Sequence, residues 1–231
     1  MNADDFARLR QSMIAEIGAQ AIYVSARIGK AAFSRRVMQV MDQVPRHAFV
    51  PVELQEYAYA NTPLPIGFDK TISQPFIVAL MTDLLDIEPH DTVLEVGTGL
   101  GYQAAIVAAL ARKVYSIELI EELSREARQR LTRLGFTNVE LRVGNGSHGW
   151  AEHAPFDKVI VTAAPDLIPS PLIDQLKAGG KMAIPAGLPD AQQLILIEKD
   201  SHGSVTTRDI LPVRFSQLEG SEPDGRARIA Q

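Results

Sequence analysis

Acidic residues stand on both sides of a glycine-rich segment near the middle of the chain. Glu95 precedes Gly97, Gly99 and Gly101, and Glu118 follows the loop about 20 residues later, the spacing found in nucleotide-binding βαβ units. Glycines let the backbone turn tightly and let a ligand approach the main chain. A carboxylate at the end of the neighbouring strand can accept hydrogen bonds from both hydroxyls of a ribose. This combination predicts a site for a nucleoside-containing ligand.

The charge and spacing of this segment indicate which ligand it binds. A glycine triplet alone also occurs in plain turns, and the G-x-G-x-G spacing here differs from the G-x-G-x-x-G of dinucleotide sites. The carboxylate of Glu95 would repel a pyrophosphate, whereas it would attract an ammonium or sulfonium group. The sequence therefore favours S-adenosylmethionine over a nicotinamide cofactor.

Short apolar segments alternate with helical patterns from Asp91 onward, and they position this loop. Helices are expected over residues 102–111, 119–134 and 170–176. Strands are expected over residues 92–96, 113–117, 139–143, 156–162, 181–185, 193–199 and 204–211. Such alternation predicts an α/β fold with a doubly wound, mainly parallel seven-stranded sheet. The last two strands are separated only by a short turn, which predicts an antiparallel edge.

The chain before residue 89 lacks this alternation. Helical periodicity predicts helices over residues 4–18, 34–44 and 77–85, whereas residues 49–75 contain several prolines and no regular pattern. Long loops in compact domains often carry function. We therefore expect residues 1–88 to form a helical and loop extension that closes over the site, residues 89–219 to form the cofactor-binding core, and residues 220–231 to form a flexible tail.

The core segments Leu94–Ala105, Val114–Glu118 and Phe156–Pro165 resemble motifs of S-adenosylmethionine-dependent methyltransferases, and of the protein-L-isoaspartate O-methyltransferase family in particular. The segment Leu94–Ala105 is similar to the first motif of that family almost residue for residue. Further similar segments are Val114–Glu118, Phe156–Pro165, Leu176–Lys181 and Ile184–Pro185. The resemblance implies a Rossmann-like class I methyltransferase fold.

The N-terminal part carries the more discriminating resemblance. The segments Val44–Pro51, Leu64–Gly67 and Thr71–Pro75 are similar to sequences that distinguish the protein-L-isoaspartate family. In that family the segment that matches Thr71–Pro75 closes over the active site, and its serine, here Ser73, lies beside the reacting carboxylate. The resemblance implies cofactor contacts from Thr71, Ile72, Gln74, Glu95, Gly97, Thr98, Gly99, Glu118, Leu119, Gly144 and Asn145.

The implied reaction methylates the free α-carboxylate of L-isoaspartyl and D-aspartyl residues in damaged proteins, so that a succinimide forms and repair begins. A carboxylate has an ordinary pKa near 4 and needs no general base at neutral pH. We therefore expect Ser73 to position one carboxylate oxygen rather than to act as a nucleophile. Two alternatives stay open: a carboxyl methyltransferase specialised for another acid or peptide, and a non-catalytic relative that binds the cofactor.

Two segments depart from the family pattern. The loop after the third expected strand has Asn145 where the family usually has aspartate, so a hydrogen bond to the adenine amino group would lack charge assistance. We expect a modest loss of cofactor affinity. The stretch from Ile17 to Phe33 is longer than the family pattern and lacks its Arg-Gly-Ile sequence. An oligomer contact and a shifted lid are both open interpretations of this stretch.

The composition limits the partners. The chain has no cysteine, which excludes cysteine-ligated metal sites and thiol nucleophiles. Its formal net charge is −5, so we do not expect a general nucleic-acid-binding surface. The five histidines show no convincing ligand spacing, and no metal site is expected. The apolar stretches are too short to span a bilayer. We expect a cytoplasmic protein that binds isoaspartyl peptides and proteins, with no nucleic-acid or membrane partner. A monomer is expected, and a dimer is left open.

Overall fold

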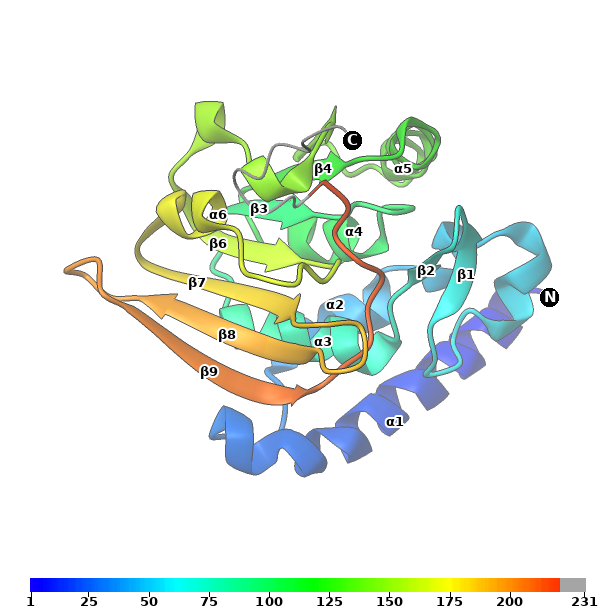
Figure 1. Ribbon diagram of the computed structural model, residues 1–231. Coiled ribbons are helices and arrows are strands. Elements are labelled where there is room, and N and C mark those ends of the chain that lie inside the picture. Colours follow the sequence, from blue (N-terminus) through cyan, green and yellow to red (C-terminus); the bar gives the residue numbers. More distant parts are fainter. Residues whose placement is uncertain (221–231) are drawn as a thin grey trace.

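A seven-stranded sheet forms the centre of the molecule in a computed structural model that describes residues 1–220 (Figure 1). Its strand order is β5-β4-β3-β6-β7-β8-β9. The strands are β3 (Thr92–Val96), β4 (Lys113–Glu118), β5 (Val139–Val143), β6 (Phe156–Val161), β7 (Leu176–Ala186), β8 (Gln193–Lys199) and β9 (Val205–Pro212). The strands β3 to β7 are parallel to one another, whereas β8 runs antiparallel to both β7 and β9. The predicted fold class and antiparallel edge are confirmed.

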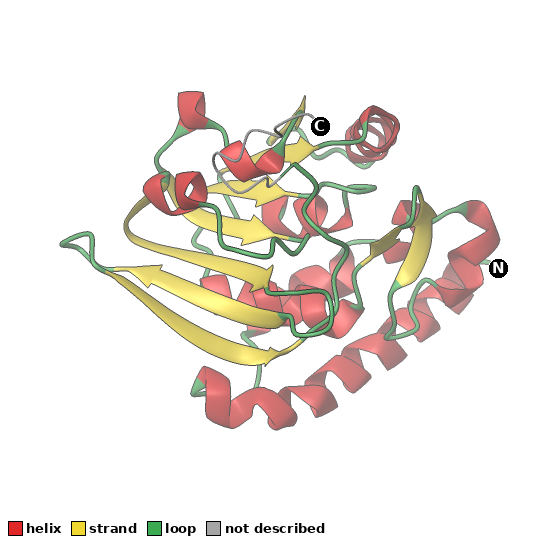
Figure 2. Ribbon diagram, viewed as in Figure 1, coloured by secondary structure: helices red, strands yellow, loops and turns green. Residues whose placement is uncertain are grey.

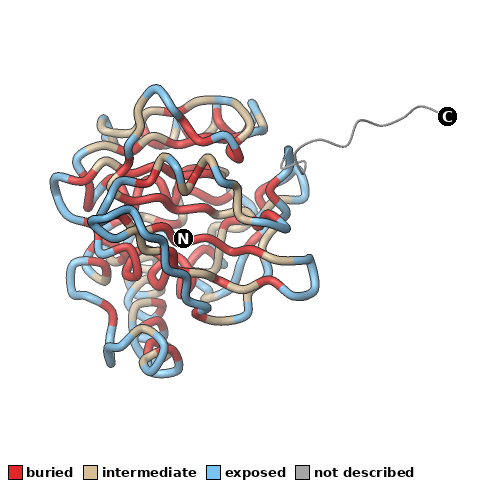
Figure 3. Tube along the Cα trace, turned by 60° about the vertical axis from the view of Figure 1, so that its left-hand side comes forward, coloured by how far each residue is buried: buried red, intermediate tan, exposed pale blue. Residues whose placement is uncertain are grey.

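The two faces of the sheet bury two separate hydrophobic clusters, and Figure 2 shows helices on both sides of it. Side chains alternate along a strand, so Val93 joins the larger cluster and Leu94 the smaller one. Helices α3 (Pro75–Leu85), α4 (Tyr102–Ala108) and α5 (Glu121–Arg133) pack in the larger cluster. The short helix α6 (Ser170–Asp174) covers the other face. Figure 3 shows buried residues gathered in the interior of the molecule, with many of the exposed residues in the peripheral segments.

Helix α1 (Ala3–Ile28) extends ten residues beyond its predicted end at Gly18. Its buried face continues through Met13, Ile17, Ala21 and Val24 at helical spacing, and this face packs against α3 and the edge strand β9. The helix ends where Gly29 adopts the left-handed conformation and donates its N–H to the carbonyl of Ser25. Packing along this face outweighs the cost of a glycine inside the helix.

The remaining N-terminal elements include a short hairpin that the sequence pattern did not predict. The strands β1 (Leu64–Gly67) and β2 (Lys70–Ile72) pair in antiparallel fashion within the proline-containing segment. Helix α2 (Arg35–Gln43) begins after Ser34, whose hydroxyl caps Val37 N–H. The 3-10 turns are η1 (Arg46–Phe49), η2 (Val52–Tyr57), η3 (Gly146–His148) and η4 (Ala151–His153).

Residues before and after position 88 contribute to the same larger hydrophobic cluster. The proposed division into an extension and a core therefore stays a prediction from the sequence. The predicted tail, apart from Gly220, lies outside the described residues. Within residues 1–220, the helices lack the combined length and hydropathy that a membrane span needs.

Candidate functional site

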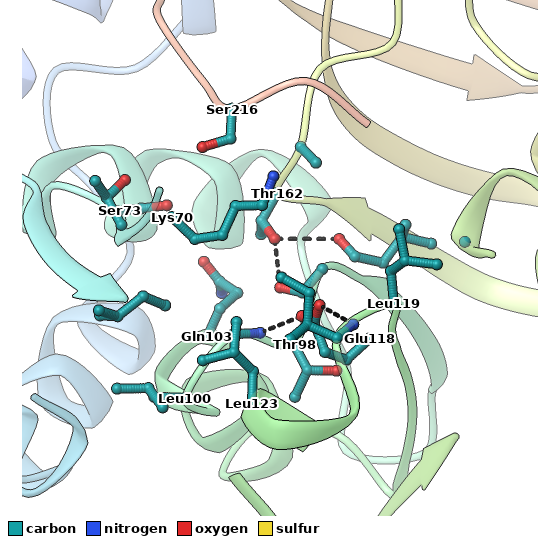
Figure 4. Close-up of a pocket in the computed structure, with 18 of the residues that line it drawn as sticks. Lys70, Ser73, Thr98, Leu100, Gln103, Glu118, Leu119, Leu123, Thr162 and Ser216 are labelled. Atoms are coloured by element: carbon teal, nitrogen blue, oxygen red, sulfur yellow. Dashed lines mark hydrogen bonds between the residues drawn. The ribbon is translucent and has the colours of Figure 1, made fainter. Parts of the chain in front are cut away.

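A pocket opens at the carboxyl ends of β3 and β4, where the glycine loop turns into α4 (Figure 4). This is the place where ligands bind in open α/β sheets. The sheet supplies the strand ends, and the β1–β2 hairpin brings the segment after β2 to the opposite wall. The predicted site residues that line this pocket are Thr71, Ile72, Ser73, Gly97, Thr98, Gly99, Glu118 and Leu119.

Side chains are excluded at two positions beside the pocket, one in the glycine loop and one in the loop after β5. Gly97 has a φ of 94° and a Cβ there would stand 2.5 Å from the Thr162 hydroxyl. A Cβ on Gly146 would stand 2.3 Å from the nearest methyl carbon of Val96. The Thr162 hydroxyl donates to the Gly97 carbonyl at 2.6 Å. This bond fixes the glycine loop against the segment that follows β6. The main chain is therefore exposed to the pocket in a fixed shape.

The Glu118 carboxylate is held in place before any ligand arrives. One oxygen accepts the Gly99 N–H at 2.8 Å and the other accepts the Ile120 N–H at 3.0 Å, as the dashed lines in Figure 4 show. A carboxylate has about four lone-pair sites, so each oxygen can accept one further hydrogen bond. Two adjacent hydroxyls, such as those of a ribose, match these two free positions.

Glu95 lies behind the loop rather than in the pocket lining. Its side chain is fully buried, and one carboxyl oxygen accepts a hydrogen bond from Ser116, whose hydroxyl also lies 2.6 Å from that of Thr98. The other oxygen of Glu95 has no hydrogen-bond partner among the described residues. Burial raises the pKa of Glu95 to about 8, the hydrogen bond from Ser116 opposes this rise, and the charge of Glu118 adds to it. In the ligand-free protein this carboxyl is therefore mostly protonated at neutral pH, and a cationic ligand at the loop would favour its ionised form.

A second cavity, of about 620 Å³, adjoins the first. The two cavities share four lining residues, and each of the four carries a hydroxyl group: Thr71, Ser73, Thr162 and Ser216. Thr162 uses its hydroxyl on the loop. Within residues 1–220, the hydroxyls of Ser73 and Ser216 make no hydrogen bond. We call the place where the two cavities meet, at these four residues, the junction. The hydroxyls of Ser73 and Ser216 can donate hydrogen bonds to a group placed there.

Two anchors hold the segment that contains Ser73. The Arg46 guanidinium donates to the Ser73 carbonyl at 2.8 Å and to the Ala58 carbonyl at 2.8 Å. The Asn61 side-chain oxygen accepts the Phe76 N–H at 2.9 Å, which fixes the first turn of α3. The segment thus joins the β1–β2 hairpin to helix α3. The hydrogen bonds to its main chain hold Ser73 where the two cavities meet.

The remaining predicted cofactor residues do not line the first pocket. Gln74 lines the second cavity, and its amide donates to the Asn61 carbonyl at 2.9 Å. The Asn145 oxygen accepts from Ser147 N–H at 2.9 Å, and its amide donates to the Gly220 carbonyl at 2.9 Å. Gly144 lies beside Asn145 outside the lining. Cofactor contacts by these residues and by Glu95 stay predictions.

A C-terminal segment that the sequence analysis did not select covers one side of the pocket. Residues 216–219 line the pocket, and they pair with Ala164 through main-chain hydrogen bonds. The Lys70 ammonium group binds the Glu219 carboxylate at 2.5 Å, which ties this segment to the hairpin. No local sequence pattern within residues 216–219 predicts that they cover the pocket, because their contacts join parts of the chain that are distant in sequence. Within residues 1–220, no group of acidic or histidine side chains is placed to hold a metal ion.

The fold, the glycine loop and the acid at the end of β4 define a class I methyltransferase that uses S-adenosylmethionine. The sequence model of the family named protein-L-isoaspartate(D-aspartate) O-methyltransferase matches residues 20–222. Because the match covers most of the chain, the chain belongs to this family.

Similar proteins agree with this membership. The protein-L-isoaspartate O-methyltransferase 1 of Polaromonas sp. strain JS666 is 69% identical over 96% of this chain and 94% of its own length. A solved protein-L-isoaspartate O-methyltransferase matches with a TM-score of 0.78 at 26% identity, over 91% of this chain and 66% of that chain. A putative enzyme of this name from Plasmodium falciparum, solved with S-adenosyl-L-homocysteine, has a TM-score of 0.76 at 23% identity, over 91% and 98% of the two chains. At 23% identity, the similarity to the Plasmodium falciparum structure shows the fold alone.

Proposed function

We propose that this chain transfers a methyl group from S-adenosylmethionine to the free α-carboxylate of L-isoaspartyl and D-aspartyl residues in damaged proteins. The observation that carries the proposal is the junction of two cavities at four hydroxyl-bearing residues. One cavity has the features of a nucleoside site, and the other opens beside Ser73. The methyl ester would then close to a succinimide, whose hydrolysis returns part of the residue to normal aspartate.

The residues of the first cavity suit the cofactor. Glu118 would accept the ribose hydroxyls, the main chain at Gly97 and Gly99 would lie against the ligand, and Glu95 would favour its positive charge through the loop. S-adenosylmethionine supplies an electrophilic methyl group when it is bound. The predicted contacts from Thr71, Ile72, Thr98 and Leu119 are supported by their position in the lining.

The chain's task at the acceptor is positioning. A carboxylate is already ionised at neutral pH, so no residue has to remove a proton. The Ser73 hydroxyl would hold one carboxylate oxygen by donating a hydrogen bond, and the Ser216 hydroxyl lies in the same junction. Orientation and removal of water around the carboxylate are the effects that raise the rate.

Radiolabelled methyl transfer to an isoaspartyl peptide and to its normal aspartyl twin tests this proposal. Methylation of the isoaspartyl peptide alone is expected. Methylation of neither peptide by folded protein that binds the cofactor would contradict it, and would favour a specialised or non-catalytic relative. A cytoplasmic location and a monomeric state remain predictions from the sequence.

A further inference from the structure

The extended second half of helix α1 lies beside the second cavity. In Figure 1 this helix runs beneath the edge strand β9. The Arg27 guanidinium donates to the Ile210 carbonyl at 2.5 Å, and Arg208 donates to the Arg27 carbonyl. These bonds fix the helix along the open edge of β9. Much of the stretch from Ile17 to Phe33, which departs from the family pattern, therefore belongs to an ordered helix. This helix lies next to the acceptor site, by which we mean the second cavity and Ser73.

Three polar side chains of α1 form one stripe along this helix. Gln20, Tyr23 and Arg27 are three and four residues apart, which places them on one face of the helix. They line a third cavity, of about 350 Å³, whose apolar walls include Val24, Phe76 and Leu211.

The third cavity continues the second one. Four residues line both cavities: Gln20, Phe76, Leu211 and Pro212. Gln20 is also tied to the acceptor site, since its side-chain oxygen accepts a hydrogen bond from Asn61 at 2.9 Å, and Asn61 in turn fixes Phe76. A continuous groove thus leads from the Ser73 junction to Tyr23 and Arg27.

The exposure and charge of this groove indicate a peptide rather than a small ligand. Tyr23 is 86% exposed, an unusual position for a tyrosine without a partner. Arg27 and Arg214 line the third and second cavities respectively, and neither forms an ion pair within residues 1–220. From Gln20 to Arg27 the helix rises about 10 Å, which corresponds to about three residues of extended peptide.

We infer that Gln20, Tyr23 and Arg27 form a subsite for the chain that flanks the damaged residue of the substrate. The occupant is an extended peptide segment that begins at the methylated residue and carries an apolar side chain against Tyr23 and an acidic one near Arg27. This inference rests on the proposed function, because it places the isoaspartyl carboxylate at Ser73. The subsite gives the enzyme a preference among damaged sequences that the junction itself does not provide.

Two isoaspartyl peptides test the subsite. The short one has three residues with the isoaspartyl residue in the centre, and the long one adds phenylalanine and glutamate on both sides. With the wild-type protein, we expect the long peptide to have a KM about fivefold or more below that of the short one. Tyr23→Ala should raise the KM for the long peptide by about fivefold. It should leave kcat for both peptides and the KM for the short peptide unchanged.

Ile22→Ala is the matched control, because Ile22 is 66% exposed on the same turn but lines none of these cavities. Equal KM values for Ile22→Ala and Tyr23→Ala with the long peptide would overturn the subsite. An equal effect of Tyr23→Ala on both peptides, or a change in its sedimentation that indicates a lost contact between copies, would overturn it as well. If the wild-type protein methylated neither peptide, the proposed function itself would fail.

Discussion

The Arg46 guanidinium donates a hydrogen bond of 2.8 Å to the main-chain carbonyl of Ser73. Arg46 is fully buried, and one of its terminal nitrogens has no partner among the described residues. Burial lowers the pKa of Arg46 to about 10, and Tyr102, whose ring lies 4.8 Å from the guanidinium, opposes this change. A buried arginine without a carboxylate partner is costly. Here it fixes the main chain of the residue expected to meet the substrate.

Arg46→Lys should therefore lower kcat/KM for an isoaspartyl peptide. Lysine keeps the charge but cannot reproduce the fixed fork that reaches Ala58 and Ser73 together. Loss of one hydrogen bond to a charged group is worth about 1.5 kcal/mol, so we expect a decrease of about tenfold. Steady-state kinetics and calorimetric titration of S-adenosylmethionine measure the two effects separately.

The cofactor affinity should change little, because Arg46 does not line the first pocket. Arg36→Lys is a suitable control, since Arg36 is an exposed arginine at the start of α2. An Arg46→Lys protein with wild-type kcat/KM would show that the Ser73 segment holds its position without this bond.

Glu95 should make the stability of the ligand-free protein depend on pH. The pKa of its buried carboxyl is raised to about 8 from an ordinary value of 4.5. Between these values the folded state keeps a proton that the unfolded state has lost, so stability falls as pH rises through this range. Glutamine resembles the protonated carboxyl, and Glu95→Gln should remove this contribution.

Thermal unfolding over a series of pH values provides the measurement. We expect Glu95→Gln and wild type to have similar midpoints at about pH 5, and the variant to be the more stable at about pH 9. Glu122→Gln, which changes an exposed acid in the first turn of α5, serves as the control. Parallel pH curves for Glu95→Gln and wild type would mean that the buried carboxyl is already ionised in the folded protein.

Much of the core could be predicted because its signals are local. The strands after Asp91 are short apolar segments bounded by turns, and Gly135, which follows α5 with a φ of 83°, is the residue type that commonly ends a helix. The spacing of the glycine loop and Glu118 predicted one site, the family resemblance added residues 71–73 and Leu119, and all of these line one pocket. The wider family resemblance supplied what those residues bind.

Other features could not be predicted because their causes are not local. The turn of the β1–β2 hairpin consists of Phe68 and Asp69, both with positive φ, and carries no Asn-Gly or Asp-Gly signal. Gly18 resembled a helix end, yet the buried face of α1 continues past it. The covering segment at residues 216–219 depends on contacts with Ala164 and Lys70, which no short-range pattern reveals.

Asn145 should weaken cofactor binding relative to aspartate, if the side chain meets the adenine amino group. A charged acceptor strengthens such a hydrogen bond by about 1 kcal/mol, so Asn145→Asp should raise the affinity for S-adenosylmethionine about fivefold. The substitution keeps the acceptor for Ser147 but loses the donor to the Gly220 carbonyl.

Calorimetric titration of the Asn145→Asp protein tests this prediction, with the unfolding midpoint as a check on the lost bond to Gly220. An unchanged affinity at an unchanged midpoint would remove Asn145 from the cofactor site. That result would agree with its position outside the pocket lining.

The central claim is that the acceptor carboxylate is held by Ser73 where the two cavities meet. The most direct measurement compares kcat/KM for an isoaspartyl peptide between wild type and Ser73→Ala, alongside calorimetric titration of S-adenosylmethionine. Loss of a hydrogen bond to a carboxylate is worth about 1.5 to 3 kcal/mol, which predicts a decrease of about 10- to 100-fold at unchanged cofactor affinity. A Ser73→Ala protein with the full kcat/KM of the wild type would contradict the claim.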